Sequence, residues 1–473
     1  MLLRRARVDG ALVDVAVERG WITRIAPHLD DVGAEVLDLE GRDLLRGFWD
    51  EHVHVVQAAL ASVWTPLGGA ASAAEALHRM AGALAAAGPD EPVVGIGFQD
   101  GLWHDGPTLQ AIDALAGERT VVLISHDVHA AWLSSAAARR FGVTPAPDGR
   151  VREEPAFAVG RAVNALARAK VEPAVASLLR RAVARGVVGV VDFEMAWSRD
   201  AWAERMAGEW WGPRIEAAVY PAALDRAEAA GLGTGETVEG TGGLLAAGPM
   251  KTLIDGALNT RTAFCADPYP DGTHGLLTVP PAELRGLLTR ARAARLTPAV
   301  HAIGDAAITA ALDALEAVGL GGRIEHAQLV ADADLPRFAA LGVTASVQPA
   351  HLLDDRGVAA EHWPGRTGRA YPLRSLLAHG ATLAFGSDAP VAPLNPWIAM
   401  RAAVDRALPG EQPWHPEQRI PLDAALAAST RGRPTPQVGD RADLIALDTP
   451  VDRLDEHSVA LTLIAGAVRH DTR

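Results

Sequence analysis

Residues 287–305 read LLTRARAARLTPAVHAIGD, a helical run of leucine and alanine followed by a short apolar strand that ends in polar residues. The same unit occurs in residues 178–194, 335–351 and 373–388. The helices space their apolar residues by three and four positions, and three of the four end in glycine. The strands are uninterrupted apolar runs, as expected when both faces of a strand are buried. Alternating helices and buried strands predict a parallel sheet.

Eight such strands are predicted along the chain, which is enough to close a (β/α)8 barrel of the TIM type. An open, doubly wound sheet is the alternative, but no glycine-rich phosphate loop follows the first strand. The predicted strands are Phe48–His54, Val187–Phe193, Arg214–Tyr220, Met250–Ile254, Thr297–His301, Arg323–His326, Val343–Val347 and Thr382–Phe385.

Residues 58–150 are too long for a single connection between a strand and a helix. They contain their own predicted strands, at 92–98 and 120–127, and predicted helices at 74–87 and 131–141. We interpret this stretch as an insertion between the first two strands of the barrel.

The two ends of the chain, residues 1–46 and 422–473, lack the alternation of helix and strand and contain short predicted strands. We expect them to pair into one small, composite β-sandwich domain. This domain would lie beside a barrel formed by residues 47–421.

The composition limits the partners and the compartment. The chain has 473 residues with 44 basic and 58 acidic side chains, and its formal charge of −14 argues against nucleic-acid binding. No run of eighteen apolar residues predicts a membrane span, and the amino-terminal residues lack the pattern of a signal peptide. The single cysteine, Cys265, fits a reducing cytoplasm. We therefore expect a cytoplasmic protein that acts on a small molecule, and the sequence leaves open a homo-oligomer.

Polar residues follow several of the predicted strands, where a barrel carries its chemistry. His52 and His54 are two residues apart on one strand, so both imidazoles lie on one face and can reach the same ion. His301 and His326 end two later strands, and Asp388 follows the last one. A lone histidine after an apolar run is usually a packing residue, but this set of nitrogen and oxygen ligands suits Zn²⁺ or a similar divalent ion.

Lysine occurs only at Lys170 and Lys251, so 42 of the 44 basic residues are arginine. Lys251 ends the fourth predicted strand, where nearby cations would depress its pKa. A neutral lysine amine can add CO₂ and become a carbamate whose two oxygens bridge two metal ions, a reaction that arginine cannot perform. The alternative is an ordinary ion pair between Lys251 and Asp255.

The chain resembles the amidohydrolase superfamily, and within it amidohydrolase family 3, which includes N-substituted formamide deformylases. The resemblance is carried by GFWDEHVH (47–54), SHDVHAAWLSSAAARRFGV (125–143), MKTLIDGALNTRTA (250–263), HAIGDAAITAALDALE (301–316), RIEHAQLVADADLPRFAALGVTASVQPAHL (323–352) and LLAHGATLAFGSDAPVAPLNPW (376–397).

This resemblance implies a metal-dependent barrel hydrolase with one or two bound ions, zinc being the favoured ion. It implies a bridging, carboxylated Lys251 and the metal-site residues His52, His54, His301, His326 and Asp388. It also implies that the 58–150 insertion roofs the active site, where Trp103, His129 and Trp132 are the candidates for substrate contact.

Three positions depart from patterns of the superfamily. Arg46 stands where the family usually has proline, and the segment STRGRPTPQVGDRADLIALD (429–448) is short. Superfamily deaminases carry a glutamate three residues after the histidine of the fifth strand, and this chain has Gly304 there. A deaminase is therefore disfavoured.

The leading hypothesis is hydrolysis of a non-peptide C–N amide bond in a small molecule. A metal-bound hydroxide would attack the carbonyl, and Asp388 would carry the proton from the water to the leaving amine. An ester, carbamate or cyclic-amide hydrolase would use the same residues, and fold and ligands do not exclude an isomerase or decarboxylase. If the protein were a non-catalytic scaffold, some of the metal-binding residues would be absent from the sequence, and none of them is absent.

Overall fold

The computed structural model describes residues 1–31, 33–454 and 458–473. Eight parallel strands form one sheet in the order β18-β17-β16-β15-β14-β13-β12-β6. A parallel bridge between Val53 and Ala389 brings the two edges together, so the sheet is nearly closed and forms a TIM-like barrel. Its strands are β6 (Phe48–Val53), β12 (Val187–Asp192), β13 (Arg214–Val219), β14 (Leu245–Leu253), β15 (Pro298–Ala302), β16 (Gly322–His326), β17 (Val343–Val347) and β18 (Thr382–Phe385).

The predicted strands agree with the observed barrel strands, with one exception. Strand β14 begins at Leu245, five residues before its predicted start at Met250. Glycine followed by proline is typical of turns, yet the strand continues through Gly248 and Pro249. In the barrel, a Cβ on Gly248 would lie 2.6 Å from the carbonyl carbon of Ala217, so glycine permits close approach of the neighbouring strand β13.

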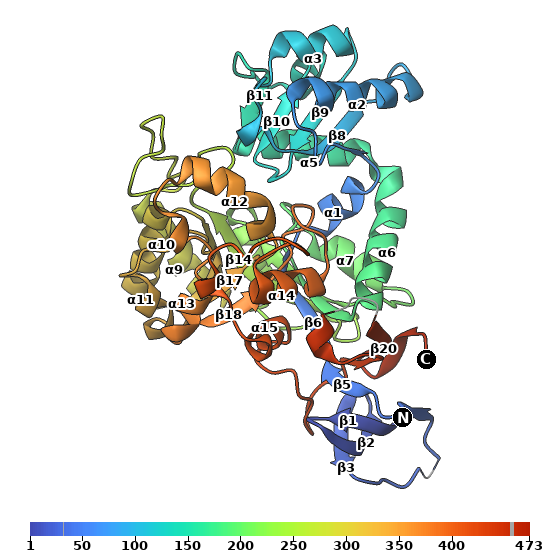
Figure 1. The fold of residues 1–473 in the computed structure, drawn as a ribbon. Helices are drawn as coiled ribbons and strands as arrows, with labels where there is room; N and C mark the ends of the chain where they lie inside the picture. Colours follow the sequence, from blue (N-terminus) through green and yellow to red (C-terminus); the bar gives the residue numbers. More distant parts are fainter. Residues whose placement is uncertain (32, 455–457) are drawn as a thin grey trace.

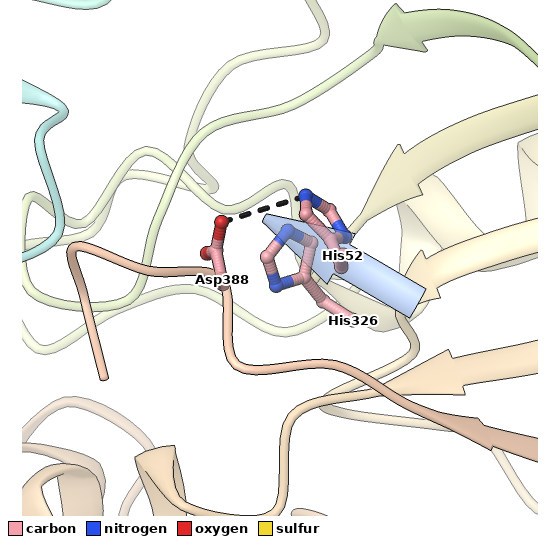
Figure 2. Close-up of side chains that lie close together, drawn as sticks. All are labelled: His52, His326 and Asp388. Atoms are coloured by element: carbon pink, nitrogen blue, oxygen red, sulfur yellow. Dashed lines mark ion pairs between the residues drawn. The ribbon is translucent and has the colours of Figure 1, made fainter. Parts of the chain in front are cut away.

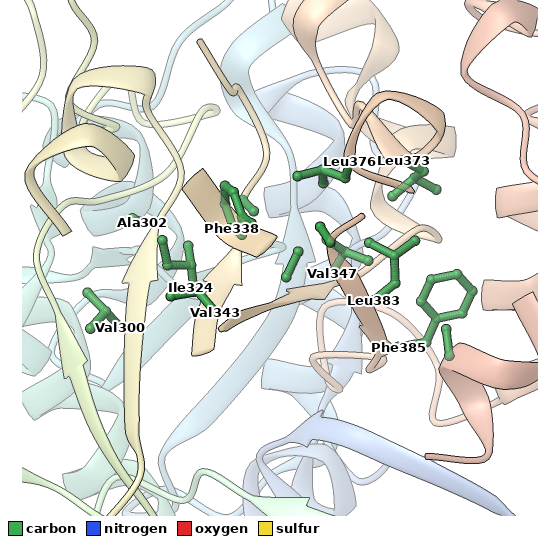
Figure 3. Close-up of a cluster of buried hydrophobic side chains, with 14 of the residues drawn as sticks. Val300, Ala302, Ile324, Phe338, Val343, Val347, Leu373, Leu376, Leu383 and Phe385 are labelled. Atoms are coloured by element: carbon green, nitrogen blue, oxygen red, sulfur yellow. The ribbon is translucent and has the colours of Figure 1, made fainter. Parts of the chain in front are cut away.

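Helices cover the outside of the barrel and bury their apolar faces against the strands (Figure 1). Phe338 and Leu376, from two of these helices, pack with Ile324, Val343 and Val347 of the strands (Figure 3). Burial of one such side chain stabilises the fold by about 1.5–3 kcal/mol. The helices are α1 (Val55–Ala61), α6 (Arg168–Ala184), α7 (Arg199–Met206), α8 (Leu224–Ala230), α9 (Pro281–Ala293), α10 (Asp305–Val318), α11 (Leu335–Ala340), α12 (His351–His362), α13 (Leu373–Ala378), α14 (Pro396–Asp405) and α15 (Leu422–Ser429).

A second sheet, in the order β11-β10-β9-β8-β7, lies between the first two barrel strands in sequence and at the top of Figure 1. Its strands are β7 (Thr65–Pro66), β8 (Val93–Phe98), β9 (Val121–Ser125), β10 (Ala130–Leu133) and β11 (Arg150–Arg152). The helices of this part are α2 (Ala73–Ala86), α3 (Leu109–Ala116), α4 (Ser135–Phe141) and α5 (Glu154–Leu166).

The predicted helix over 131–141 is wrong in its first turn. Ala130–Leu133 forms strand β10, which pairs with both β9 and β11. Helix α4 begins only after Ser134, whose Oγ accepts a hydrogen bond from the backbone N–H of Ala137. Pairing on both sides of β10 therefore overrides the helix propensity of its alanines.

Strands from both ends of the chain share a third sheet, in the order β21-β20-β19-β5-β1-β2-β3, with β4 paired to β1. It lies at the other end of the molecule from the β7–β11 sheet (Figure 1). Its strands are β1 (Leu2–Val8), β2 (Ala11–Glu18), β3 (Trp21–Ala26), β4 (Val36–Asp38), β5 (Asp43–Arg46), β19 (Leu444–Leu447), β20 (Val459–Ile464) and β21 (Ala467–Asp471). The helices that the structure describes are all too short or too polar to span a bilayer.

Closure of the barrel depends on the absence of a side chain at Gly386, which follows β18. A Cβ at this position would lie 2.5 Å from Cβ of His52 and 2.6 Å from its backbone nitrogen. We expect Gly386→Ala to lower the free energy of unfolding by about 1–3 kcal/mol, because strand β6 cannot move without opening the sheet. Chemical denaturation measures this loss.

Gly286→Ala in helix α9 is the matched control, since nothing lies within 4 Å of a Cβ there. Alanine favours a helix over glycine, so this control should be neutral or stabilising. Equal stability of Gly386→Ala and the wild type would contradict the close approach of β18 to β6.

Candidate metal site

The carboxyl ends of the barrel strands bring the predicted ligands together. His52 lies on β6 and His54 directly follows it, His301 and His326 lie at the ends of β15 and β16, and Asp388 follows β18. Each of these side chains is buried, with at most 8% of its residue surface exposed. The arrangement exists because the carboxyl ends of all eight parallel strands meet at one mouth of a barrel.

His52, His326 and Asp388 form the centre of this cluster (Figure 2). One ligand atom from each lies within 4.8 Å of the other two. Oδ1 of Asp388 is 3.4 Å from Nε2 of His52 and also 3.4 Å from Nε2 of His54. Nδ1 of His54 is buried and has no hydrogen-bond partner among the described residues.

His301 extends the cluster on the side of His326, and the centroids of the two rings are 4.5 Å apart. Burial holds the pKa of both imidazoles well below its ordinary value, and neighbouring histidines lower it further. Burial likewise lowers the pKa of His52 to about 4. Neutral imidazoles offer a lone pair, which is the form that binds a metal ion.

Lys251 lies inside the cluster and not on its surface. Its Nζ is 3.0 Å from Nε2 of His52 and 4.3 Å from the ring centroid of Phe193. Burial lowers the pKa of Lys251 to about 8, and the nearby Arg323 also acts to lower it. The alternative ion pair with Asp255 does not form, because that carboxylate accepts the backbone N–H groups of Phe264, Ile303 and Gly304.

Asp388 is held as a carboxylate. Burial alone would raise its pKa, but the neighbouring His52 and His54 side chains outweigh burial and hold the pKa well below its ordinary value. The backbone of Asp388 has a φ of 54° and its N–H donates to the carbonyl of His52 at 2.6 Å. A non-glycine residue in this conformation is uncommon, and such strain concentrates at functional sites.

Glu325 orients the first histidine, and the sequence analysis missed it. Its Oε2 accepts a hydrogen bond from Nδ1 of His52 at 2.7 Å, which leaves Nε2 of that ring directed at the cluster. Arg323 binds Oε1 of Glu325 at 2.9 Å and Oε2 of Glu51 at 2.7 Å. Arg431 then binds Oε1 of Glu51 at 2.6 Å. The only sequence signal is the Arg323-x-Glu325 spacing, which places both residues on one face of a strand.

Asp192 and Glu194 form a second supporting pair that sequence reasoning did not assign. Asp192 accepts the backbone N–H of Val55, and Glu194 accepts those of Val56 and Gln57, at the start of helix α1. Burial raises the pKa of Glu194 to about 7, and the adjacent Asp192 raises it further. The two carboxylates thereby fix the chain immediately after His54.

Among the three predicted substrate contacts, the structure brings His129 alone to the cluster. Its ring centroid is 5.6 Å from that of His301, and its Nδ1 forms an ion pair with Glu153 at 2.8 Å. Burial opposes the charged form, but Glu153 outweighs burial and raises the pKa of His129 to about 9. His129 also lines the same cavity as His326 and Asp388.

Trp103 and Trp132 pack within the insertion and do not join the cluster. The indole N–H of Trp132 donates to the carbonyl of Thr108, and its side chain is fully buried. The indole N–H of Trp103 donates to the carbonyl of Ala70, and its ring packs on Phe98. Both are core residues of the β7–β11 part, a role that large aromatic side chains commonly fill.

Asp127 faces the cluster from the insertion. Its Oδ1 accepts from Oγ of Ser125 at 2.5 Å and from the backbone N–H of His129 at 3.1 Å. Its Oδ2 is buried and has no hydrogen-bond partner among the described residues. Asp127 lines both the cavity over the metal ligands and the adjoining outer cavity. The next residue, Val128, has a φ of 56°, which is strained for a β-branched side chain.

The donor set fits a divalent ion. Four buried histidines, one buried carboxylate and an unpartnered ring nitrogen lie together, without the full set of protein hydrogen bonds that buried polar groups normally have. Nitrogen and oxygen ligands of this kind suit zinc and similar ions. A metal ion at the cluster would give His52, His326 and Asp388 a shared partner.

The fold is a TIM-like barrel with a cluster of side chains at its mouth that could hold a metal ion. The chain belongs to the amidohydrolase family, whose model matches residues 35–470. It is 29% identical to Protein LONG AFTER FAR-RED 3 of Arabidopsis thaliana, over 84% of this chain and 75% of that protein. It is 28% identical to the N-substituted formamide deformylase of Arthrobacter pascens, over 93% and 90%. An uncharacterized metal-dependent hydrolase from Pyrococcus furiosus has a similar structure, with 26% identity, a TM-score of 0.74 and coverage of 95% and 99%.

Substitution of Glu325 tests whether its contacts with Arg323 and His52 stabilise the fold. We expect Glu325→Gln to lower the free energy of unfolding by about 3 kcal/mol, because the buried Arg323 loses one of its two carboxylate partners. Denaturant titration measures the loss. Glu283→Gln, at an exposed position of α9, is the control and should leave stability unchanged. A Glu325→Gln protein as stable as this control would show that the Arg323–Glu325 ion pair contributes little to the free energy of unfolding.

Proposed function

We propose that this protein is a metal-dependent hydrolase that cleaves a non-peptide C–N amide bond in a small molecule. The observation that carries the proposal is the buried cluster of His52, His326 and Asp388 at the mouth of the barrel. The similarity to a protein named N-substituted formamide deformylase supports an amide bond as the bond that is cleaved. Zinc is the favoured ion, with one or two ions bound. The single, buried Cys265 supports a cytoplasmic location.

His52, His54, His301, His326 and Asp388 would hold the metal. When bound, a divalent ion supplies Lewis acidity, which activates water and polarises a substrate carbonyl. The ionised Asp388 carboxylate takes a proton from the attacking water and passes it to the nitrogen of the leaving amine. Glu325 accepts a hydrogen bond from the Nδ1–H of His52, which leaves the lone pair on Nε2.

Lys251 would act as a carbamate. Its neutral amine nitrogen forms a bond to the carbon of CO₂ and loses one proton, which leaves an anionic group with two oxygens. Its two oxygens, which share one negative charge, would lie near Nε2 of His52, because Nζ of Lys251 is 3.0 Å from that nitrogen. Burial favours the neutral amine that this reaction needs.

Two adjoining cavities suggest where the substrate lies. The outer one combines polar side chains with apolar walls, and its lining includes Gln99, His126, Asp127, Asn259 and His351 together with Leu258, Ile303 and Val391. The other is largely apolar, and its walls include Trp64, Ile96, Ile124, Phe157 and Met195. Phe157 and Met195 also line the metal-ligand cavity, so the apolar pocket opens beside the reacting centre. These surroundings favour a substrate with one polar and one apolar part.

Asp127 and His129 are positioned to hold the substrate between these cavities. The free Oδ2 of Asp127 can accept only an N–H or O–H, and the N–H of a secondary amide provides one. The charged His129 donates to a carbonyl or carboxylate oxygen. Esters lack the N–H donor, so an amide can form the hydrogen bond to Oδ2 of Asp127 and an ester cannot. Carbamates and cyclic amides retain the donor and stay as alternatives.

Gly304 supports the exclusion of a deaminase. A Cβ on Gly304 would lie 2.1 Å from the carbonyl oxygen of Phe264, so a glutamate at this position would require the backbone to move.

The Asp388→Asn variant tests the proposed reaction. We expect metal-loaded wild type to hydrolyse members of a panel of N-formyl and N-acyl amines, esters, carbamates, cyclic amides and dipeptides. Asp388→Asn should reduce kcat by about 10²–10⁴-fold on the same substrates, because asparagine cannot accept the proton. Elemental analysis and thermal denaturation should show a folded variant that still contains metal. If metal-replete Asp388→Asn turned over substrate at the wild-type rate, the proposed proton transfer by Asp388 would be wrong.

Lys251→Arg tests the carbamate. Arginine keeps the positive charge but forms no carbamate, so Lys251→Arg should lose activity as fully as Lys251→Ala. A short carboxylic acid added to Lys251→Ala should restore part of the activity by supplying oxygens. Lys170→Arg, at the exposed lysine, is the control and should retain full activity. An active Lys251→Arg enzyme would instead indicate a simple electrostatic role.

A further inference from the structure

A large polar cleft lies between the amino end of the barrel and the sheet formed by the two ends of the chain. Its volume is about 340 Å³, and four arginines line it: Arg46, Arg214, Arg431 and Arg441. Arg214 begins β13 and Arg46 ends β5, so the cleft opens at the opposite end of the barrel from the metal ligands. It is a second concave site, separate from the proposed active site.

The carboxylates of this cleft are already engaged. Asp443 forms two contacts with Arg214, at 2.6 and 3.1 Å, and accepts the backbone N–H of Ala465. Glu216 binds Arg431 at 2.6 Å. Four guanidinium groups and two carboxylates therefore line the cleft, which leaves a surplus of two positive charges in a protein whose formal charge is −14.

Arg46 and Arg441 supply this surplus. Neither has a carboxylate within ion-pair distance among the described residues. Arg46 donates one hydrogen bond to the carbonyl of Arg433, and Arg441 lies over the ring of Trp21, 4.9 Å from its centroid. Burial lowers the pKa of both side chains. Asp440 and Asp443 raise the pKa of Arg46 and Asp443 raises that of Arg441, whereas nearby arginines, including Arg431 for Arg46 and Arg214 for Arg441, lower them. The positive groups therefore lie close enough to repel one another.

Arg214 and Arg441 converge on the loop before β14. Arg214 donates to the carbonyl of Gly243 at 2.8 Å, and Nη1 of Arg441 is 4.0 Å from the position of a Cβ on Gly243. Arg431 is stacked on Trp49, with 3.3 Å between the guanidinium carbon and the ring centroid. Stacking and ion pairs hold these groups in place, so the cleft is already shaped before any ligand binds.

We propose that this cleft binds a small organic dianion, with Arg46 and Arg441 as its principal contacts. Guanidinium groups bind phosphate and carboxylate oxygens through paired hydrogen bonds, and two free guanidinium groups match two negative charges. The volume lies in the range of small-molecule sites, so it accommodates an organic phosphate or dicarboxylate as well as the bare anion. The bound dianion would remove the repulsion among the arginines. This inference does not depend on the reaction catalysed at the metal site.

Calorimetric titration of the metal-loaded protein tests the proposal, with inorganic phosphate and succinate as separate probes and sodium chloride holding the ionic strength constant. We expect saturable binding of at least one probe and a rise in Tm at saturation. The Arg46→Gln/Arg441→Gln double variant should bind at least tenfold more weakly. Binding of phosphate alone assigns a phosphate ligand, and binding of succinate alone assigns a dicarboxylate.

The control is the Arg24→Gln/Arg168→Gln double variant, in which two exposed arginines outside the cleft are changed. It loses the same charge and should bind like the wild type. An anion held at the metal ligands would bind equally to all three proteins, so equal binding by the cleft double variant overturns the proposal. Absence of saturable binding of both probes to the wild type also overturns it. If the cleft double variant does not fold, Arg441→Gln alone, at an exposed position, should still weaken binding.

Discussion

A chain of charge pairs runs from the exposed Arg431 into the inside of the barrel, and the proposed active site depends on it. The chain begins at Arg431, continues through Glu51, Arg323 and Glu325, and ends at His52, with each contact between 2.6 and 2.9 Å. Isolated charges at these depths would be strongly unfavourable, but each group here has an opposite charge on at least one side. The ion pairs therefore fix the orientation of the His52 ring, while strand β6 fixes the position of its backbone.

This arrangement explains how a neutral imidazole, a carboxylate and a lysine amine lie within a few ångströms of one another. Glu325 takes the N–H of His52, so the other ring nitrogen carries the lone pair that Lys251 and Asp388 face. The contacts of 3.0–3.4 Å from Nε2 of His52 mark the space in which an ion would replace them.

Much of the fold and the gathering of the candidate site residues at the barrel mouth could be predicted because both follow local patterns. The helix–strand unit repeats, and a polar residue at the end of a strand must lie at the mouth of a barrel, so His301, His326 and Asp388 could be placed without a structure. The roles of Glu325 and Glu51 could not be predicted, because Glu325 contacts His52 and Glu51 contacts Arg323 across more than 270 residues of sequence. Trp132 was misplaced for a related reason. Its neighbours in sequence resemble a binding loop, but β10 turns its ring into the core of the insertion.

Arg431 connects the two ends of the barrel, since it lines the arginine cleft and also binds Glu51. Its charge is balanced by Glu51 and Glu216, so it needs no further anion. Arg46 and Arg441 have no such balance, and a dianion in the cleft would be drawn to them first. Such a ligand would leave the contact between Arg431 and Glu51 intact and would reduce the positive potential around it. The barrel thus separates two kinds of polar site: balanced pairs inside support the metal ligands, and unbalanced arginines at the amino end are available to a ligand.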